Sequence, residues 1–311
     1  MAGFDRVLVV RGGAIGDFIL TLPIFSALRE TFRSAVIGSL APVGRGELAM
    51  AAGLADEIQD LDGRGWAEFF VSDGDLDPEK VKWLSQFDLI ISFLHDPERV
   101  WANNLKRISS ARLLQGCFRP SEKGKLHASE VLLSVLEKVG VSGMDSLPQI
   151  DVEAADTDRY VLAVHPGSGS ESKNWPEAKW SQFLSQWLEG NSGRVLVVGG
   201  EAEAGKLIRI KRAIDPAQVD FLENEPLPEL ARALKSSRIF VGHDSGISHL
   251  AAALGVQSVI LWGSTNRVVW GPQHHHVRFI QSDGTIDSIT VDEVLRAVED
   301  FLAAAKIVKF S

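Results

Sequence analysis

Short apolar runs alternate with longer amphipathic stretches along the first half of the chain. Residues 6–11 form a valine-rich run, typical of a parallel strand buried on both faces. Apolar side chains recur at helical spacing over residues 17–33, where Pro23 predicts a bend, and again over 128–139. Further strand-like runs occupy residues 35–40, 57–61, 89–93 and 112–114. The alternation predicts an α/β unit with a parallel sheet.

The pattern stops between residues 140 and 158, where glycine, serine, proline and acidic residues follow one another and indicate a linker. It resumes with strand-like runs at 160–165, 194–198, 219–222, 238–241, 258–261 and 277–280, and with a last helix at 291–305. We therefore predict two Rossmann-like doubly wound α/β domains facing a cleft, over residues 1–150 and 151–311. Such sheets bind ligands at the carboxyl ends of their strands.

Composition places the chain among soluble globular proteins. Of its 311 residues, 45% are hydrophobic and 23% are charged. The single cysteine, Cys117, excludes an intramolecular disulfide and indicates a reducing compartment. The chain shows no signal-peptide pattern and no apolar stretch long enough for a membrane span, so we expect a cytoplasmic protein. A net charge of −9 argues against nucleic acid as a partner.

The segment 241–254 is predicted to run from a strand through a tight turn into a helix. Asp244 and Ser245 lie where the helix begins, and Gly246 follows them. The unpaired N–H groups at a helix start suit a phosphate. The alternative interpretation is that Asp244 caps the helix and that His249 packs inside the protein.

A glycine turn follows the first strand, in the sequence Gly-Gly-Ala-Ile-Gly-Asp from Gly12 to Asp17. It lacks the G-x-G-x-x-G spacing of a dinucleotide loop, and a carboxylate would repel a phosphate there. Glycines let another molecule approach the backbone, so Asp17 is well placed to act as a base. Alternatively, Asp17 is a first-turn acid that stabilises the helix dipole.

Two further strand ends carry candidate donor-binding groups. The loop at 165–176 supplies hydroxyls, including that of Ser168, and the cation of Lys173, which could grip a diphosphate together with the Asp244 turn. Glu201 and Glu203 follow the next strand, where an acid often accepts hydrogen bonds from a ribose. The alternatives are an ordinary loop and ordinary first-turn acids.

Two sequence patterns resemble metal-binding motifs, but neither is interpreted as a metal site. The three consecutive histidines at 274–276 cannot all face one ion, which favours an exposed loop. The segment beginning at Asp73 resembles a calcium loop, but Pro78 replaces the required glycine and Leu84 the required glutamate. We predict no bound metal.

Taken together, these motifs resemble the bacterial heptosyltransferases, glycosyltransferase family nine. The resemblance rests on residues 11–23, 165–176, 241–249 and 261–264, which occur in the family's order and span nearly the whole chain. It implies a two-domain GT-B fold, with an N-terminal acceptor-side domain and a C-terminal donor-binding domain. It also implies a nucleotide-sugar donor such as ADP-heptose, a lipopolysaccharide inner-core acceptor, and inverting transfer without a metal or other cofactor.

The resemblance also implies roles for single residues. Asp17 matches the proposed base, Lys173 the donor-phosphate lysine and Glu203 the ribose-binding acid, with Glu201 second. Ser245 stands where the family usually has threonine, and His243 matches no assigned position. The predicted donor-binding residues are Ser168, Lys173, Glu201, Glu203, Asp244, Ser245, Gly246 and His249.

The distribution of charge along the chain predicts where the acceptor binds. Between residues 99 and 125 the chain carries seven cations and one acid, although it is acidic overall. An anionic glycolipid acceptor would need such cations, and the same patch could rest on the inner membrane surface. The alternative is a solvated basic face. The predicted acceptor-side residues are Gly13, Arg112, Arg119 and Lys123.

These assignments predict that Asp17 takes a proton from an acceptor hydroxyl while Lys173 and the helix start at Ser245 stabilise the leaving diphosphate. The alternatives are a transferase using another nucleotide sugar and a catalytically silent nucleotide-sugar-binding protein. A nicotinamide oxidoreductase is a more distant third, because the dinucleotide fingerprint fails.

Overall fold

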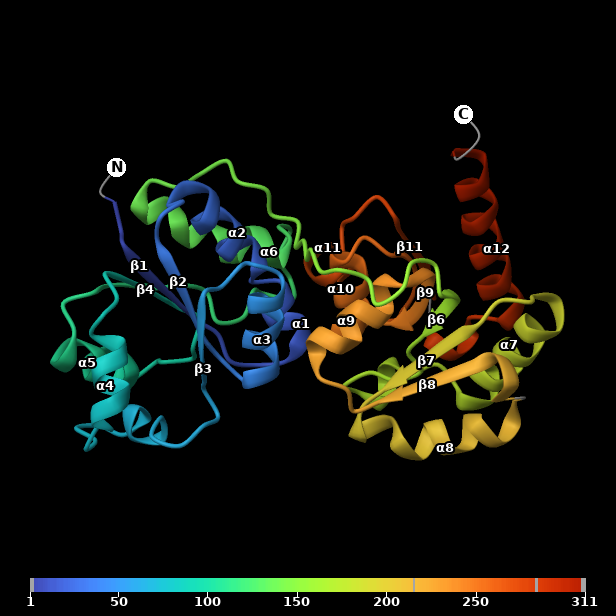
Figure 1. The fold of residues 1–311 in the computed structure, drawn as a ribbon, viewed down its shortest axis with the longest axis horizontal. Coiled ribbons are helices and arrows are strands. Elements are labelled where there is room, and N and C mark those ends of the chain that lie inside the picture. Colours follow the sequence, from blue (N-terminus) through green and yellow to red (C-terminus); the bar gives the residue numbers. More distant parts are fainter. Residues whose placement is uncertain (1–2, 215, 283–284, 309–311) are drawn as a thin grey trace. The chain divides into compact units, whose positions relative to one another are not determined.

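A computed structural model describes residues 3–214, 216–282 and 285–308 of the chain (Figure 1). The chain divides into two units, Met1–Pro148 and Gln149–Ser311. Residues 141–159 form neither helix nor strand, and the boundary lies within them.

The first unit contains a five-stranded sheet in the order β3-β2-β1-β4-β5, in which every neighbouring pair is parallel. Each predicted strand of this half is present: β1 Arg6–Val10, β2 Val36–Ala41, β3 Glu57–Asp60, β4 Leu89–Ser92 and β5 Arg112–Gln115. The apolar side chains of β1 are fully buried, as expected for a central parallel strand. Strand order reverses between β1 and β4, so the loops that follow these strands open at the switch point of the sheet.

The helix predicted over residues 17–33 is two helices in the structure. The hydroxyl of Thr21 donates a hydrogen bond to the backbone oxygen of Asp17 (2.8 Å), and Pro23 lies in the first turn of the second helix, where its missing N–H costs nothing. The bend expected at Pro23 is therefore a complete break. The helices of this unit are α1 Ile15–Ile19, α2 Leu22–Thr31, α3 Val43–Ala51, α4 Pro78–Leu84, α5 Val100–Ile108 and α6 Ala128–Leu133, with 3₁₀ turns η1 Ala67–Phe70 and η2 Ser134–Val139.

The second unit contains a six-stranded parallel sheet in the order β11-β10-β9-β6-β7-β8. Its predicted strands are also all present: β6 Tyr160–Val164, β7 Val195–Gly199, β8 Val219–Glu223, β9 Ser237–His243, β10 Gln257–Trp262 and β11 Val277–Gln281. Here the order reverses between β6 and β9. The loops after these two strands therefore share the switch point, where such sheets bind their ligands.

Helices cover both faces of the second sheet, and a core rich in tryptophan lies beneath them (Figure 1). Trp175, Trp180 and Trp187 are almost completely buried. The helices are α7 Glu177–Gly190, α8 Ala204–Ala213, α9 Leu227–Lys235, α10 Gly246–Ala253, α11 Arg267–Trp270 and α12 Val291–Val308, with 3₁₀ turns η3 Glu171–Lys173, η4 Glu201–Glu203, η5 Pro216–Gln218 and η6 Ile286–Ser288. Among the described residues, no helix combines the length and the apolar character needed to cross a bilayer.

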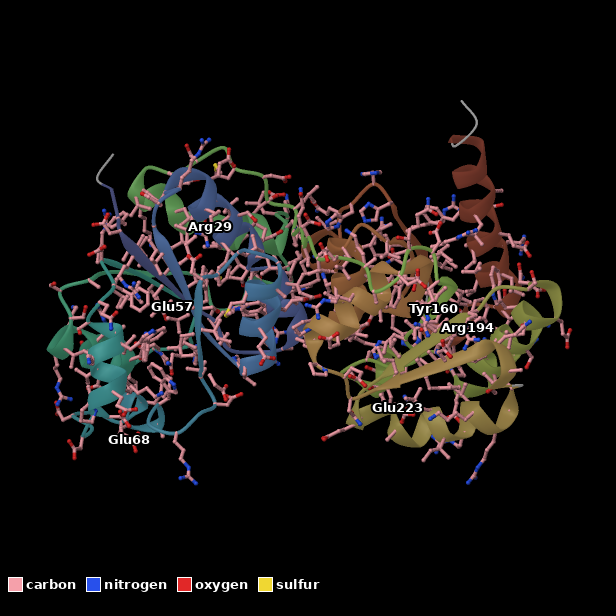
Figure 2. All side chains as sticks on the ribbon, viewed as in Figure 1. Arg29, Glu57, Glu68, Tyr160, Arg194 and Glu223 are labelled. Carbon is pink, nitrogen blue, oxygen red and sulfur yellow. The ribbon has the colours of Figure 1, made fainter. Side chains whose placement is uncertain are left out.

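Polar side chains join strands at the amino edge of this sheet. Tyr160 and Arg194 are both labelled in Figure 2, and the Nε of Arg194 donates to the carboxylate of Asp220 in β8 (3.1 Å). The hydrogen bond from Arg194 lowers the pKa of Asp220, and burial raises the pKa of Tyr160. Ion pairs this exposed contribute little stability, about 0–1 kcal/mol.

Candidate functional site

At the switch point of the second sheet, the loop after β6 meets the turn after β9. The ammonium nitrogen of Lys173 lies 2.5 Å from Oδ2 of Asp244, although 71 residues separate the two along the chain. Asp244 is buried, whereas Lys173 is partly exposed. The structure therefore brings together the two predicted donor motifs, and Asp244 serves as the partner of Lys173.

Ser245, and not Asp244, caps helix α10. Its hydroxyl accepts a hydrogen bond from the backbone N–H of Ser248 (3.3 Å), and the hydroxyl of Ser248 donates to the backbone oxygen of His243 (2.5 Å). Gly246 is the first helical residue, and His249 lies buried one turn further on. The helix start predicted as a phosphate site is thus present at the switch point, with Asp244 left to pair with Lys173.

The two candidate ribose acids lie in different environments. Glu201 is exposed, whereas Glu203 is buried and its Oε2 accepts the backbone N–H of Gly200 (2.9 Å). Burial raises the pKa of Glu203, but hydrogen bonds from His165 and Gly200 outweigh that effect and hold it below its usual value. A side chain at Gly167 would collide with Glu203, because an added Cβ would lie 2.2 Å from its Cγ. Glu203 is thus fixed under the loop that carries Lys173.

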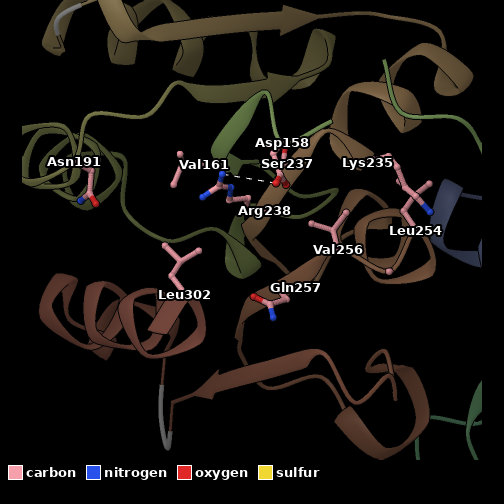
Figure 3. A pocket seen from close by; sticks show the side chains of 11 residues that line it. Asp158, Val161, Asn191, Lys235, Ser237, Arg238, Leu254, Val256, Gln257 and Leu302 are labelled. Atoms are coloured by element: carbon pink, nitrogen blue, oxygen red, sulfur yellow. Dashed lines mark ion pairs between the residues drawn. The ribbon is translucent and has the colours of Figure 1, made fainter. Parts of the chain in front are cut away.

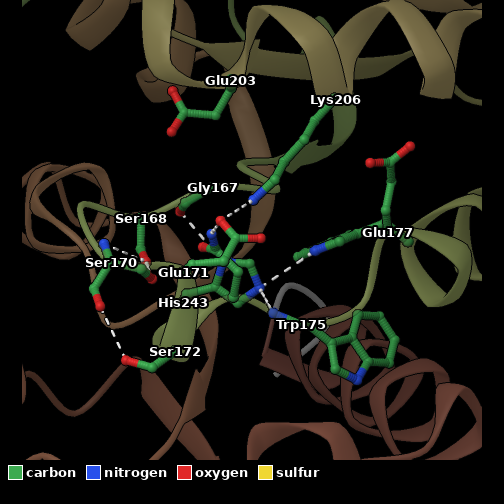
Figure 4. Close-up of polar contacts among 12 residues, drawn as sticks. Gly167, Ser168, Ser170, Glu171, Ser172, Trp175, Glu177, Glu203, Lys206 and His243 are labelled. Carbon is green, nitrogen blue, oxygen red and sulfur yellow. Dashed lines mark hydrogen bonds and ion pairs between the residues drawn. The ribbon is translucent and has the colours of Figure 1, made fainter.

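His243, which the sequence left without a role, is completely buried beneath the same loop. Its Nε2 accepts hydrogen bonds from the backbone N–H of Trp175 (2.9 Å) and from the indole of Trp180 (3.3 Å). Its Nδ1 lies 3.2 Å from the backbone oxygen of Gly167 (Figure 4). Burial lowers the pKa of His243 to about 3. The imidazole is therefore neutral near pH 7.

This buried histidine should make the second unit sensitive to acid. An unfolded chain protonates the imidazole near pH 6.5 and the folded unit only near pH 3, so the stability is complete above pH 6.5 and is lost as the pH falls. We expect about 1.4 kcal/mol of lost stability per pH unit, or about 2 kcal/mol between pH 7 and pH 5. Opening free energies of β6 and β9 amides, measured by hydrogen exchange, should show this loss in the wild type and a smaller one in His243→Asn. Equal losses in both proteins would contradict the assignment.

Lys206 is a second cation over the loop that sequence reasoning missed. From the first turn of α8 it donates to Glu171 (3.1 Å), and Asn174 donates to the same carboxylate oxygen (3.0 Å). These two hydrogen bonds lower the pKa of Glu171. The hydroxyl of Ser168 donates within the loop to the backbone oxygen of Ser170 (2.8 Å), as Figure 4 shows. The signal for Lys206 is weak in the sequence, because a lysine in a helix is ordinary.

In the first unit, Asp17 lies at the carboxyl edge of the sheet, after β1. One carboxylate oxygen accepts the backbone N–H of Ala14 (3.1 Å), so Asp17 does stabilise the start of α1. Gly13 precedes it with a positive φ of 94°, and an added Cβ there would lie 3.0 Å from Oδ2 of Asp17. The exposed backbone of Gly13 leaves this carboxylate accessible from solvent.

Arg11 lies buried beside Asp17 and orients it. Its Nη2 is 3.5 Å from Oδ1 of Asp17, while its Nη1 donates to the backbone oxygen of Phe118 (2.9 Å). Burial lowers the pKa of the Arg11 guanidinium, and the charge of Asp17 opposes that shift. Arg45 in α3 is half-buried, and this burial lowers its pKa, whereas the charges of Asp62 and then Asp17 oppose the shift. Neither arginine was singled out from the sequence.

The three cations predicted for the acceptor do not lie together. Arg112 begins β5 at the level of Val7 in β1, about 10 Å along the strands from the edge that holds Asp17, and donates to the backbone oxygen of Lys138 (2.5 Å). Arg119 and Lys123 follow the carboxyl end of β5 and are exposed. Arg119 is adjacent to Phe118, whose oxygen binds Arg11. Arg112 is therefore away from the edge of the sheet that carries Asp17, whereas Arg119 is next to a residue that binds Arg11 at that edge, and Lys123 lies further along the same loop.

A cavity of about 550 Å³ lies at the opposite edge of the second sheet from the Lys173–Asp244 pair. It is lined where strands β6, β9 and β10 begin, by Val161, Ser237 and Gln257 among others (Figure 3). In it Arg238 lies 3.7 Å from Asp158. Ligands of doubly wound sheets bind at the carboxyl edge, so this cavity is not the donor site.

The described parts of the chain contain no group of three or more His, Cys, Asp or Glu side chains placed to hold a metal ion. His276 of the three consecutive histidines lies 2.9 Å, through Nε2, from the backbone oxygen of Ala252. That contact gives this histidine a structural role.

Two Rossmann-like units, each with charged side chains at its switch point, define the class of the protein as a two-domain protein with the GT-B fold. A family model described as "Glycosyltransferase family 9 (heptosyltransferase)" matches residues 140–293, which include every predicted donor-binding residue. This segment of the chain therefore belongs to the family that the motifs predicted.

Known proteins support this assignment. Lipopolysaccharide heptosyltransferase 1 of Salmonella typhimurium is 33% identical over 116 residues, which is 37% of this chain and 35% of the relative. The chain thus spans about a third of the length of that relative. Heptosyltransferase II of Escherichia coli has a TM-score of 0.79 at 16% identity, covering 97% of this chain and 99% of its own. Heptosyltransferase WaaC of Escherichia coli, solved with ADP-2-deoxy-2-fluoro heptose, has a TM-score of 0.74 at 19% identity, covering 95% and 99%. At these identities the two structures show the fold, and they confirm the predicted two-domain architecture.

Proposed function

We propose that the protein is an inverting, metal-independent transferase that moves a heptose or a related sugar from a nucleotide diphosphate, ADP-heptose, to a lipopolysaccharide inner core or a similar acceptor. One observation carries the proposal: the Lys173–Asp244 pair lies at the switch point beside the start of α10, within the segment that matches the family model. The ADP-sugar analogue held by the Escherichia coli relative and the name of the Salmonella relative support the donor and the acceptor.

In this proposal the second unit binds the donor. The ammonium of Lys173 and the first N–H groups of α10 stabilise the negative charge that develops on the departing diphosphate. The buried carboxylate of Glu203, fixed by Gly200 and His165, accepts hydrogen bonds from the ribose. Glu201 is the second choice because it is exposed. A positively charged lysine and a helix start replace the divalent ion that other sugar transferases use.

The first unit binds the acceptor and supplies the base. An oxygen of Asp17 takes the proton of an acceptor hydroxyl as that hydroxyl oxygen attacks the anomeric carbon. The bond between that carbon and the diphosphate oxygen breaks in the same step, which inverts the configuration at the carbon. Arg11 orients the carboxylate through its 3.5 Å contact, and the glycine turn at Gly13 gives the acceptor access to it.

The acceptor would be held by cations that follow β5. We propose Arg119 and Lys123 for this role, in a cytoplasmic protein that makes peripheral contact with the inner membrane. Replacing both with alanine should raise the acceptor Michaelis constant roughly tenfold, at about 0.5–1 kcal/mol for each exposed cation, and lower its dependence on salt. Donor binding should stay unchanged. Steady-state kinetics at low and high ionic strength would measure both effects.

Arg112→Ala is the matched control for that experiment, because Arg112 belongs to the same basic stretch but lies at the other edge of the sheet. It should leave the acceptor Michaelis constant unchanged. If the Arg119→Ala/Lys123→Ala protein shows wild-type acceptor kinetics at low salt, these two cations belong to a solvated surface and do not bind the acceptor.

Release of ADP from ADP-heptose in the presence of a lipopolysaccharide core acceptor tests the proposed function directly. Transfer predicts release that depends on the acceptor, together with a product of increased mass. ADP binding without release would identify a silent nucleotide-sugar-binding protein. Turnover with a different nucleotide sugar, and none with ADP-heptose, would support the proposed transfer reaction but contradict ADP-heptose as the donor.

A further inference from the structure

The loop that carries Ser168 and Lys173 is anchored at both of its ends. Seven residues, 168–174, separate Gly167, three residues after the end of β6, from Trp175 at the entry to α7, and residues 169–172 are exposed. The single 3₁₀ turn η3 gives this stretch little rigidity of its own. The place of Lys173 therefore depends on what holds Gly167 and Trp175, in addition to the contacts of Lys173 with Asp244 and of Glu171 with Lys206.

A single imidazole holds both ends. The ring of His243 contacts the backbone oxygen of Gly167 through Nδ1 (3.2 Å) and the backbone N–H of Trp175 through Nε2 (2.9 Å), as Figure 4 shows. Gly167 has no side chain, so this backbone contact is its principal tie to β9. The next residue of the chain, Asp244, pairs with Lys173 itself. Two consecutive residues at the end of β9 thus fix the loop at three points.

The contacts settle the tautomer of the ring. Nε2 faces two N–H donors, the backbone of Trp175 and the indole of Trp180, so it carries no hydrogen and accepts from both. The hydrogen is then on Nδ1, which donates to Gly167. The charged or titratable groups that act on the ring are His165 and Lys206, which disfavour a positive charge on it, and Glu203, which favours one. A proton on Nε2 would break two hydrogen bonds at once.

We propose that His243 is a positioning residue for donor binding: as a neutral ring that donates to Gly167 and accepts from Trp175, it holds the loop so that Lys173 faces the diphosphate. The inference rests on the proposed function of that loop and adds a residue that no sequence motif assigned to a role. His243 does not touch the donor in this proposal, because it is completely buried beneath the loop.

Replacing His243 with glutamine or with asparagine tests its contacts with Trp175 and with Gly167 separately. In His243→Gln the amide oxygen reaches the place of Nε2 and keeps the Trp175 contact, whereas in His243→Asn the amide nitrogen takes the place of Nδ1 and keeps the Gly167 contact. His243→Ala keeps neither. Lys173 is two residues from Trp175, so the Trp175 anchor should matter more to it. We expect ADP affinity to fall in the order wild type, His243→Gln, His243→Asn, His243→Ala, with the alanine variant weakened about tenfold or more.

Hydrogen exchange of the ligand-free protein tests whether His243 holds the loop at Gly167 and Trp175, a pair of contacts that we call the clamp. This test needs no donor. The Trp175 amide should exchange about tenfold or more faster in His243→Asn and His243→Ala, and close to the wild-type rate in His243→Gln. His276→Ala is the matched control, because it removes a different histidine, which is partly buried and whose Nε2 contacts the backbone oxygen of Ala252. This variant should leave both the exchange rate of the Trp175 amide and the affinity for ADP unchanged. If Trp175 exchanges at the wild-type rate in both the asparagine and alanine variants, there is no clamp.

Titration calorimetry with ADP and steady-state kinetics then test positioning. The variants should raise the donor Michaelis constant more than they lower kcat, and glutamine should restore most of the affinity lost in alanine. Equal ADP affinity in all four proteins would overturn the positioning role even if exchange is faster. If the wild type binds no ADP, the proposed function fails, whereas the exchange pattern at Trp175 still supports the clamp.

Discussion

Asp17→Asn should lower the rate of sugar transfer by roughly 10²-fold or more, the usual contribution of a general base, while donor affinity stays near that of the wild type. Asparagine has almost the same shape as aspartate, and its oxygen can still accept the Ala14 N–H that starts α1. The first unit should therefore fold normally. What is lost is the ability to take a proton from the acceptor hydroxyl.

Turnover assays and titration of the intact donor would measure the two quantities separately. Asp88→Asn is the matched control, because Asp88 also accepts backbone N–H groups, from Asp5 and Arg6, but lies at the amino edge of the same sheet. It should keep wild-type turnover. Near-normal turnover in Asp17→Asn would remove Asp17 from the mechanism.

Lys173→Ala should weaken nucleotide diphosphate binding by roughly 1.5–3 kcal/mol, the range for a hydrogen bond to a charged group. The variant loses a cation and also leaves the buried Asp244 carboxylate without the partner 2.5 Å away. That carboxylate would then repel the diphosphate. We therefore expect the double variant Lys173→Ala/Asp244→Asn to bind ADP more tightly than Lys173→Ala alone.

The same titrations with EDTA present should give the same affinities, because the proposal uses no metal. Lys179→Ala serves as the matched control: this lysine lies in the first turn of α7 near the loop but donates to the backbone oxygen of Ile289 (2.9 Å). Its loss should leave ADP binding unchanged. Loss of ADP binding or turnover by the wild type on chelation would refute the metal-free scheme.

The fold could be predicted from the sequence because central parallel strands need continuous apolar runs. The runs at β1 and β6 are of this kind, and each is followed by glycine at the turn. The sequence also predicts that Lys173 and Asp244 lie close together, since both follow strands at the same edge of the sheet. The identity of the helix cap could not, because Asp244 and Ser245 are both good N-caps and only the backbone decides between them.

Other parts of the site depend on contacts that sequence patterns do not record. Glu201 and Glu203 look alike in the sequence, and only the course of η4 buries Glu203 against Gly167. Arg112 and Arg119 belong to one basic stretch, but a strand passes between them and carries them to opposite edges. Arg11 and His243 are missed because a charged or polar residue at the end of an apolar run gives no sign of its partners.

The anchoring of the donor loop by a residue 68 positions away has a consequence for synthesis of the chain on the ribosome. At roughly 5–20 residues per second, His243 is added about 3–14 s after Trp175. During that interval β6 and the loop exist without β9, so the polar groups of Gly167 and Trp175 are hydrated and Lys173 has no carboxylate partner. The donor crevice is completed late in translation, when β9 inserts beside β6 and delivers the ring and the carboxylate together.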